Sequence, residues 1–281
     1  IQHSRRVLES YLTNIPNSQW GGDKDEIANA IGSTNAILFL LNDESEYENP
    51  DLLALIDAGI NGQDLLATEV FPEGSPPYLT SSSRDATYEE ILHFLHGYGI
   101  QLAAPGIQNA IEAAMYDAIN DGFYNPLPDI PSEHYDEEYL AMGLECYFGL
   151  WAHDPSDDGY CGDQEYAFIN REEMEDGDSA LFSIIQDFFG DTWEYQAELP
   201  ESFSSTFHLE FEDSLDYTHR SKYLKNISLT GQSASNLFGN DYFNAFYGNY
   251  GNNQFLGLGG DDLLYGSSGI DRALYRGERE E

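Results

Sequence analysis

The sequence predicts an α+β protein with a helix-rich N-terminal domain, residues 1–212, and an all-β C-terminal domain, residues 213–281. Apolar residues recur at helical spacing over most of the chain before residue 190. Near the C-terminus, glycine, polar and apolar residues each recur every nine residues. Of the 281 residues, 41% are hydrophobic and 14% aromatic, which favours folded domains over a disordered acidic chain.

The helices are predicted from apolar stripes and from the breakers between them. Val7 to Leu12 repeat at helical spacing, and a second stripe covers Ile27 to Leu41 after the Gly21-Gly22 pair. Later helices are predicted at residues 52–56, 87–96, 107–121, 136–151 and 178–189.

Strands are predicted at fewer places. Short apolar segments flank a Pro/Gly turn at 72–77, which predicts an edge hairpin within residues 64–80. Phe203 to Phe211 alternates as a strand does, and residues 217–224 lead into the nine-residue units. The domain boundary is therefore expected near 213–228.

The nine-residue units keep three kinds of residue in phase. The first, sixth and eighth positions of the four units are Gly239, Gly248, Gly257 and Gly266; Asn244, Asn253, Asp262 and Asp271; and Phe246, Phe255, Leu264 and Ala273. Glycine permits a tight turn that a residue with a Cβ resists, and carboxylate and carbonyl oxygens are the ligands that Ca²⁺ takes. A flexible Gly/Asn-rich linker has no reason to keep this register.

These units resemble the calcium-binding nonapeptide repeat of RTX (haemolysin-type) proteins, whose repeats wind into a parallel β-roll. The resemblance implies calcium sites at the turns of the two best copies, 257–265 and 266–274. Full sites are expected only around Asp262 and Asp271, because the earlier copies carry Asn. The calcium-site residues that the resemblance implies are Asn244, Asn253, Gly257, Gly260, Asp262, Gly266, Gly269 and Asp271. A shorter copy is expected at Gly231 and Asn236.

The charge of the chain limits its partners. Asp and Glu number 51 against 11 Lys and Arg, a formal net charge of −40. Such a surface repels nucleic acid and anionic membranes, and no apolar run is long enough to span a bilayer. The charge fits an extracellular setting rich in salt or divalent cations, where the partners would be calcium ions and an extracellular protein or peptide.

The ends of the sequence favour a processed product. It begins at Ile1 without Met or a signal peptide, and 273–277 looks like the closing strand of an RTX roll. The RTX resemblance implies a longer parent protein, exported by type I secretion. In an exported protein, Cys146 and Cys161 are expected to form a disulfide, the alternative being two unrelated thiols.

One segment gathers side chains that can bind a metal. On a helix, Glu89, His93 and His96 fall on one face, and Glu90 lies beside them. The segment resembles the active-site helix of zincin metallopeptidases, in which His-Glu-x-x-His supplies two metal ligands and a general base. The segment around Glu138 resembles the third-ligand helix of zincins of the anthrax lethal factor type.

The zincin resemblance implies a metal-dependent peptidase. Glu89, His93 and Glu138 would be ligands of Zn²⁺, His96 could join them, and Glu90 would be the catalytic base. The chain departs from the family pattern because Glu89 stands where the first histidine belongs, which makes the site more negative. A degenerate site that has lost its metal therefore stays open.

Two further interpretations remain. Thr87 to Glu90 also matches a helix capping box, in which Glu90 accepts from the Thr87 amide and the helix has no catalytic role. The protein would then be a non-enzymatic extracellular module for adhesion, matrix assembly or toxin delivery. An acidic loop with His153, Asp154, Asp157 and Asp158 could bind Ca²⁺ or be a solvated surface.

Overall fold

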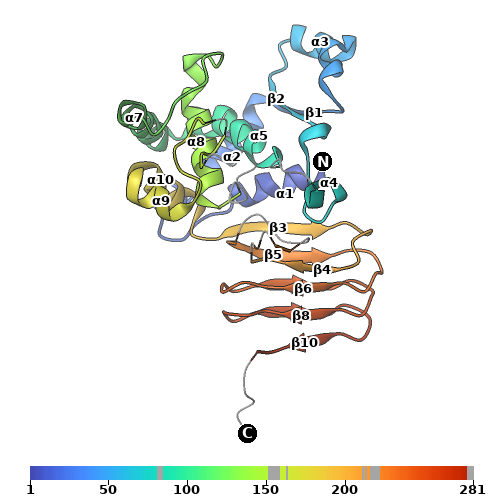
Figure 1. The fold of residues 1–281 in the computed structure, drawn as a ribbon. Coiled ribbons are helices and arrows are strands. Elements are labelled where there is room, and N and C mark those ends of the chain that lie inside the picture. The colour runs from blue at the N-terminus through green and yellow to red at the C-terminus, as the bar shows by residue number, and fades with distance from the viewer. Residues whose placement is uncertain are drawn as a thin grey trace.

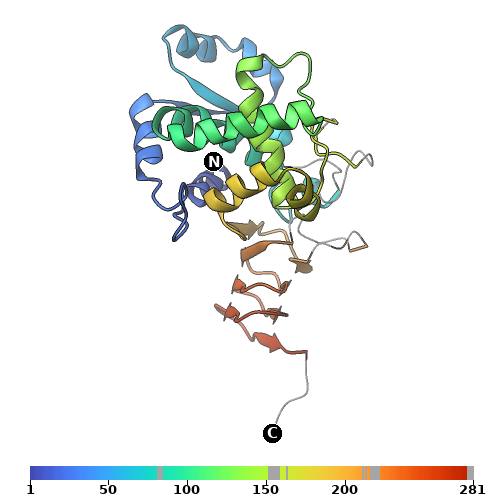
Figure 2. The same ribbon diagram turned by 90° about the vertical axis from the view of Figure 1, so that its left-hand side faces the viewer.

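A computed structural model describes residues 1–80, 85–150, 159–162, 164–210, 212, 214–215 and 222–276. The chain combines helices with parallel sheets, so the predicted α+β class is confirmed. The helices gather at one end, and a tapering stack of strands extends from them toward the C-terminus (Figures 1 and 2). The acidic loop and the end of the strand predicted at 203–211 lie outside the described residues.

The helical part follows the predicted order with added short elements. The α-helices are α1 Gln2–Tyr11, α2 Asp25–Thr34, α3 Pro50–Asp57, α4 Pro76–Thr80, α5 Thr87–Leu95, α6 Gln101–Ala103, α7 Pro105–Asp121, α8 Tyr135–Tyr147, α9 Arg171–Gly177 and α10 Ser179–Phe189. Single turns of 3₁₀-helix are η1 Glu44–Glu48, η2 Ala67–Glu69 and η4 Ser132–His134, and η3 His96–Ile100 is a π-helix. Among the described residues, no helix has the length and apolar content needed to cross a lipid bilayer.

Two predicted elements of the N-terminal part are wrong. The second apolar stripe is not one helix, because Asn35 takes a left-handed conformation that ends α2 and β1 Ile37–Leu41 follows. The β-branched Ile37 and the short apolar run suit a strand. No hairpin forms within 64–80. β2 Gly62–Leu66 pairs with β1 in parallel instead, and the Pro/Gly segment leads into η2 and α4.

The C-terminal part consists of two four-stranded parallel sheets. Successive strands alternate between the sheets, whose orders are β3-β5-β7-β9 and β4-β6-β8-β10. The strands are β3 Trp193–Leu199, β4 Thr206–His208, β5 Leu224–Leu229, β6 Asn236–Phe238, β7 Ala245–Tyr247, β8 Gln254–Leu256, β9 Leu263–Tyr265 and β10 Arg272–Leu274. We call residues 236–276, which contain β6 to β10, the repeat region.

The eighth position of each unit stacks between the two sheets. Phe246 is opposite Ile227 and Leu264 in one sheet, and Phe255 is opposite Leu237 in the other. Phe246 and Phe255 are buried, as the sequence predicts, whereas Ala273 is exposed at the outer end. Each unit is too short to bury this residue alone, so the stacking of neighbours supplies the core.

The sheets begin earlier than the predicted boundary at residue 212. β3 and β4 pair with β5 and β6, so the strands before residue 213 belong to the same two sheets as the units. One apolar core runs from Val7 in α1 to Phe255 in β8. The helices therefore pack directly on the first strands, and α1 lies beside β3 (Figure 1).

The predicted disulfide is not formed. Cys146 and Cys161 are separate buried thiols. The Sγ of Cys146 faces the carbonyl oxygen of Asn170 at 3.3 Å, and that of Cys161 faces the carbonyl oxygen of Met142 at 3.6 Å. Each thiol packs into the apolar core on its own, which is the alternative that the sequence left open.

Candidate metal centre

The start of α5 is fixed by a buried aspartate. The amide of Thr87 donates to Oδ1 of Asp85 at 3.0 Å, and no side chain caps the helix in the manner of a capping box. Oδ2 of Asp85 lies 2.6 Å from Nε2 of His3, which ties α5 to α1. The capping-box interpretation of Glu90 is therefore wrong, because Asp85 occupies the Thr87 amide.

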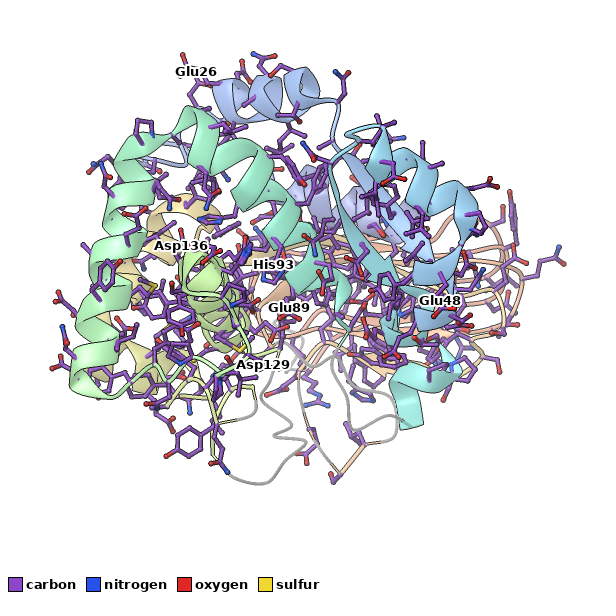
Figure 3. All side chains as sticks on the ribbon, turned by 90° about the horizontal axis from the view of Figure 1, so that it is seen from above. Glu26, Glu48, Glu89, His93, Asp129 and Asp136 are labelled. Carbon is purple, nitrogen blue, oxygen red and sulfur yellow. The ribbon has the colours of Figure 1, made fainter. Side chains whose placement is uncertain are left out.

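Three of the predicted ligands come together between α5 and α8. Glu89 and His93 lie one turn apart on α5, and Glu138 lies in the first turns of α8. One ligand atom from each side chain falls within 4.8 Å of the other two. Glu89 and His93 are buried and Glu138 is partly exposed. Figure 3 shows Glu89 and His93 side by side in the middle of the helical part, seen from above.

The two nitrogens of His93 face different carboxylates. Nε2 lies 3.7 Å from Oε2 of Glu138, and Nδ1 lies 3.7 Å from Oε2 of Glu90. Nε2 is fully buried and has no hydrogen-bond partner among the described residues. These separations are too long for hydrogen bonds, so charge alone relates the ring to the two carboxylates.

Glu90 is held in place by a hydrogen bond from the two-stranded sheet of β1 and β2. Nε2 of Gln63 in β2 donates to Oε2 of Glu90 at 2.6 Å. Glu90 therefore lies on the Nδ1 side of His93, whereas Glu138 lies on the Nε2 side. A negative charge on the Nδ1 side favours Nε2 as the nitrogen that would bind a metal. The general-base role expected of Glu90 stays a prediction.

His96 does not join the three ligands. The backbone widens into the π-turn η3 at His96, and the ring faces an earlier part of α8. Its Nε2 lies 3.7 Å from Oδ2 of Asp136, and its Nδ1 lies 3.8 Å from Oε2 of Glu137. The ring is completely buried. His96 lies two helical turns, about 10 Å along the helix axis, beyond Glu89, so a shared helix face does not bring its ring to the three ligands.

The electrostatics of the three residues favour a bound cation. Burial raises the pKa of Glu138 to about 7; His93 opposes this rise, and Glu89 adds to it. Burial lowers the pKa of His93, but the surrounding Glu90, Glu89 and Glu138 raise it to about 9. The carboxylates thus repel one another and hold a proton on the imidazole. A divalent cation would relieve the same repulsion.

The donor set fits a metal ion. Two carboxylates and one imidazole are ligands that Zn²⁺ accepts, and three protein ligands leave a coordination position open. The buried Nε2 of His93 supplies an unpaired donor that points toward Glu138. The set is richer in oxygen than a zincin site, so it also suits harder divalent ions such as Mn²⁺.

Comparison with known proteins gives no relative. No protein family, curated protein or solved structure matches the chain.

The turns of the repeat region place the sixth-position side chains against the first-position glycines. A Cβ on Gly257 would lie 1.7 Å from Oδ2 of Asp262, and one on Gly239 would lie 2.1 Å from Oδ1 of Asn244. The first position thus needs glycine because the sixth side chain folds back over it. Gly260 and Gly269 have φ of +83° and +108°, which glycine adopts without strain. Gly248 and Gly266 face Asn253 and Asp271 in the same way.

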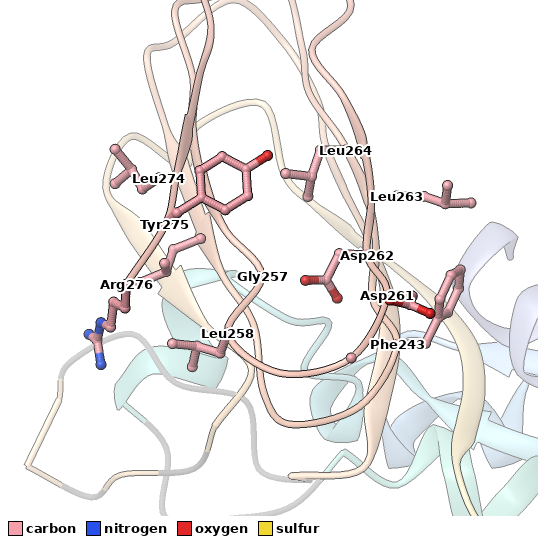
Figure 4. A pocket seen from close by; sticks show the side chains of 12 residues that line it. Phe243, Gly257, Leu258, Asp261, Asp262, Leu263, Leu264, Leu274, Tyr275 and Arg276 are labelled. Carbon is pink, nitrogen blue, oxygen red and sulfur yellow. The ribbon is translucent and has the colours of Figure 1, made fainter. Parts of the chain in front are cut away.

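A cavity of about 560 Å³ opens at the outer end of the repeat region. Asp262 and Gly257 line it, together with apolar side chains such as Leu264 and Leu274 (Figure 4). Oδ1 of Asp262 accepts from the amide of Asn244 at 3.0 Å, and Oδ1 of Asp271 accepts from the amide of Asn253 at 2.8 Å. Each carboxylate therefore lies against the preceding turn on its side of the stack. The predicted shorter copy is out of register, since Asn236 begins β6.

Sequence reasoning missed residues that support the metal centre. Gln63 holds Glu90, and Asp85 holds the first turn of α5. His3, far away in the sequence, contacts Asp85. A capping signal at Asp85 was available, because Asp two residues before a helical stripe is a common start. The contacts of Gln63 and His3 depend on tertiary packing alone.

Proposed function

We propose that this protein is a metal-dependent hydrolase of the peptidase type, carried by a secreted, calcium-binding protein with RTX-like repeats. The observation that carries the proposal is the meeting of Glu89, His93 and Glu138, with the buried Nε2 of His93 lacking a hydrogen-bond partner in the described part of the chain. A buried polar nitrogen without a hydrogen-bond partner costs free energy, and a metal ion bound to Nε2 would offset that cost.

The residues around the centre have separable roles. Glu89, His93 and Glu138 would hold the ion, and the charge of Glu90 beside Nδ1 would strengthen Nε2 of His93 as a ligand. A bound Zn²⁺ supplies Lewis-acid activation of water and polarises a carbonyl group. Asp85 and His3 tie the start of α5, the helix that carries Glu89 and His93, to α1.

The calcium part of the proposal rests on the repeat region. Its nine-residue register, parallel alternating strands and glycine turns support an RTX-like β-roll. Asp262 and Asp271 would bind Ca²⁺ together with carbonyl oxygens of the turns. Secretion to a calcium-rich exterior agrees with a net charge of −40.

Metal analysis of the purified chain tests the hydrolase proposal. Loaded with zinc and freed of excess by gel filtration, the protein should hold one zinc ion per chain at α5 and α8. Glu138→Ala should lose that ion and the cleavage of an unfolded protein such as casein. Glu112→Ala, which removes a carboxylate on α7, is the matched control and should keep both. Zinc content that is equal in the two variants would refute the proposal.

A second candidate function is a non-enzymatic extracellular module. It is favoured by the position of His93 between Glu90 and Glu138, where a protonated imidazole is neutralised without a metal. Under this alternative, His93→Gln would destabilise the fold and zinc would not alter the melting temperature. Under the hydrolase proposal, zinc raises the melting temperature of the wild type and not that of His93→Gln.

A further inference from the structure

The turns of the repeat region are of two kinds. In the turns 239–244 and 248–253, the second and sixth positions are both Asn. In the turns 257–262 and 266–271, the sixth position is Asp and the second is Leu258 or Ser267. The backbone differs as well, because Leu258 and Ser267 have φ of +73° and +67°.

In the first turn, two asparagines form a closed pair. The amide of Asn240 donates to Oδ1 of Asn244 at 3.1 Å, and Nδ2 of Asn244 donates to Oδ1 of Asn240 at 2.9 Å. Nδ2 of Asn240 donates to the carbonyl oxygens of Lys222 and Leu224, at 2.9 and 2.8 Å. Both asparagines are buried, so these bonds satisfy side chains that water does not reach.

The same pair recurs at the opposite edge of the stack. The amide of Asn249 donates to Oδ1 of Asn253 at 3.1 Å, and Nδ2 of Asn253 donates to Oδ1 of Asn249 at 3.1 Å. Nδ2 of Asn249 donates to the carbonyl oxygens of Thr230 and Ser233, at 2.8 and 3.0 Å. Two independent turns with one pattern indicate a built feature of the repeat region.

The side-chain amides of Asn240 and Asn249 contact backbone carbonyl oxygens of the kind that a calcium ion would need as ligands. Carbonyl oxygens that converge in a turn are the ligands Ca²⁺ takes in such structures. Here Nδ2 of Asn240 and Nδ2 of Asn249 each bridge two of them. An aspartate in place of Asn244 or Asn253 would bring a carboxylate toward the side-chain oxygen of its partner, and only a cation would offset that repulsion.

We propose that the asparagine pairs replace calcium, so that the turns 239–244 and 248–253 form without the ion and calcium acts only on the turns 257–262 and 266–271. The inference rests on the calcium role proposed for Asp262 and Asp271, and it divides the repeat region into an ion-independent inner part and a calcium-responsive outer part. Asn244 and Asn253, expected as calcium ligands from the sequence, are then structural donors.

Hydrogen exchange of the full chain in EDTA and in calcium tests this division. The amides of Tyr247 in β7 and Leu256 in β8 face the preceding strands β5 and β6, so they should be equally protected in both. Amides beyond residue 257 should gain protection with calcium. Loss of protection at Tyr247 and Leu256 in EDTA would overturn the inference. Exchange that calcium changes nowhere would support the asparagine pairs and refute the proposed calcium role of Asp262 and Asp271.

A designed exchange of turn types gives the second test. The double variant Asn249→Ser with Asn253→Asp gives the turn the Gly-Ser-x-Gly-x-Asp pattern of residues 266–271. In EDTA the protection of the Leu256 amide, which faces β6, should fall by about tenfold or more, and calcium should restore it. Tyr250→Ser changes an exposed side chain of the same turn and should behave as the wild type. A double variant that is indifferent to EDTA would overturn the inference.

Discussion

Substitution of Glu90 by Gln should weaken zinc binding without removing a ligand. Glu90 lies on the Nδ1 side of His93, where Gln63 fixes it with a 2.6 Å hydrogen bond. In this position its charge strengthens the imidazole as a donor at Nε2. Glu90→Gln keeps the shape and removes the charge, so the three ligands remain in place.

The size of the loss in zinc affinity follows from the distance between His93 and Glu90 and from the exposure of the Glu90 side chain. Two unit charges at the 3.7 Å between Nδ1 and Oε2 interact by about 4 kcal/mol at an effective dielectric constant of about 20. The effect of Glu90 on zinc binding is smaller than this energy. The imidazole is neutral when it binds a metal, and water screens the Glu90 side chain, which is 20% exposed. Loss of such an outer carboxylate lowers metal affinity by about 10–100-fold, or about 1.4–2.7 kcal/mol.

Competition with a chromophoric zinc chelator measures the affinity of each variant. Gln63→Ala releases Glu90 without removing its charge. Loss of this hydrogen bond, about 1 kcal/mol, should lower the zinc affinity by about fivefold. Glu112→Gln changes the same charge on α7 and should leave the affinity unaltered. Unchanged zinc affinity in Glu90→Gln, with cleavage of casein reduced by about 100-fold or more, would contradict this role of Glu90 and support the general-base role.

Three further predictions concern stability. Leu258→Gly should raise the free energy of unfolding by about 1 kcal/mol, measured in urea, because it removes a left-handed leucine at φ +73°; equal or lower stability would contradict this. Phe246→Ala should cost about 3–5 kcal/mol in the same assay, since its buried ring is part of the core, whereas exposed Tyr250→Ala should cost under about 0.5 kcal/mol. His3→Gln should lower the melting temperature most at acidic pH. Although burial lowers the pKa of His3, Asp85 raises it above 6.5 overall, so the pair stabilises fully below that pH and less as pH rises through the folded pKa; a deficit independent of pH would contradict this.

The main elements of the fold could be predicted where the pattern was local. The nine-residue register places β7, β8, β9 and β10, and the apolar stripe of α5 predicts its limits within a residue. β3 and β5 could not be predicted in this way, because the spacing of the first strands is irregular and no unit precedes them. β5 pairs with β7 of the repeat region, and β3 pairs with β5 beneath the helices, so packing sets their places.

The candidate site was predictable in its ligands and not in its support. Glu89 and His93 follow from helical spacing, and Glu138 follows from the resemblance to a downstream zincin helix. Spacing cannot show which nitrogen of His93 meets Glu90, since that depends on Gln63 in a strand that was not predicted. The asparagine pairs were missed for a similar reason, because each amide bonds to carbonyl oxygens of an earlier turn.

Anomalous scattering at the zinc edge, from a crystal of the full chain grown with excess zinc, tests the metal centre most directly. One peak is expected between α5 and α8, about 2.0–2.2 Å from Nε2 of His93 and from oxygens of Glu89 and Glu138. The absence of a peak there, or a peak on the Nδ1 side of His93 beside Glu90, would contradict the proposed centre.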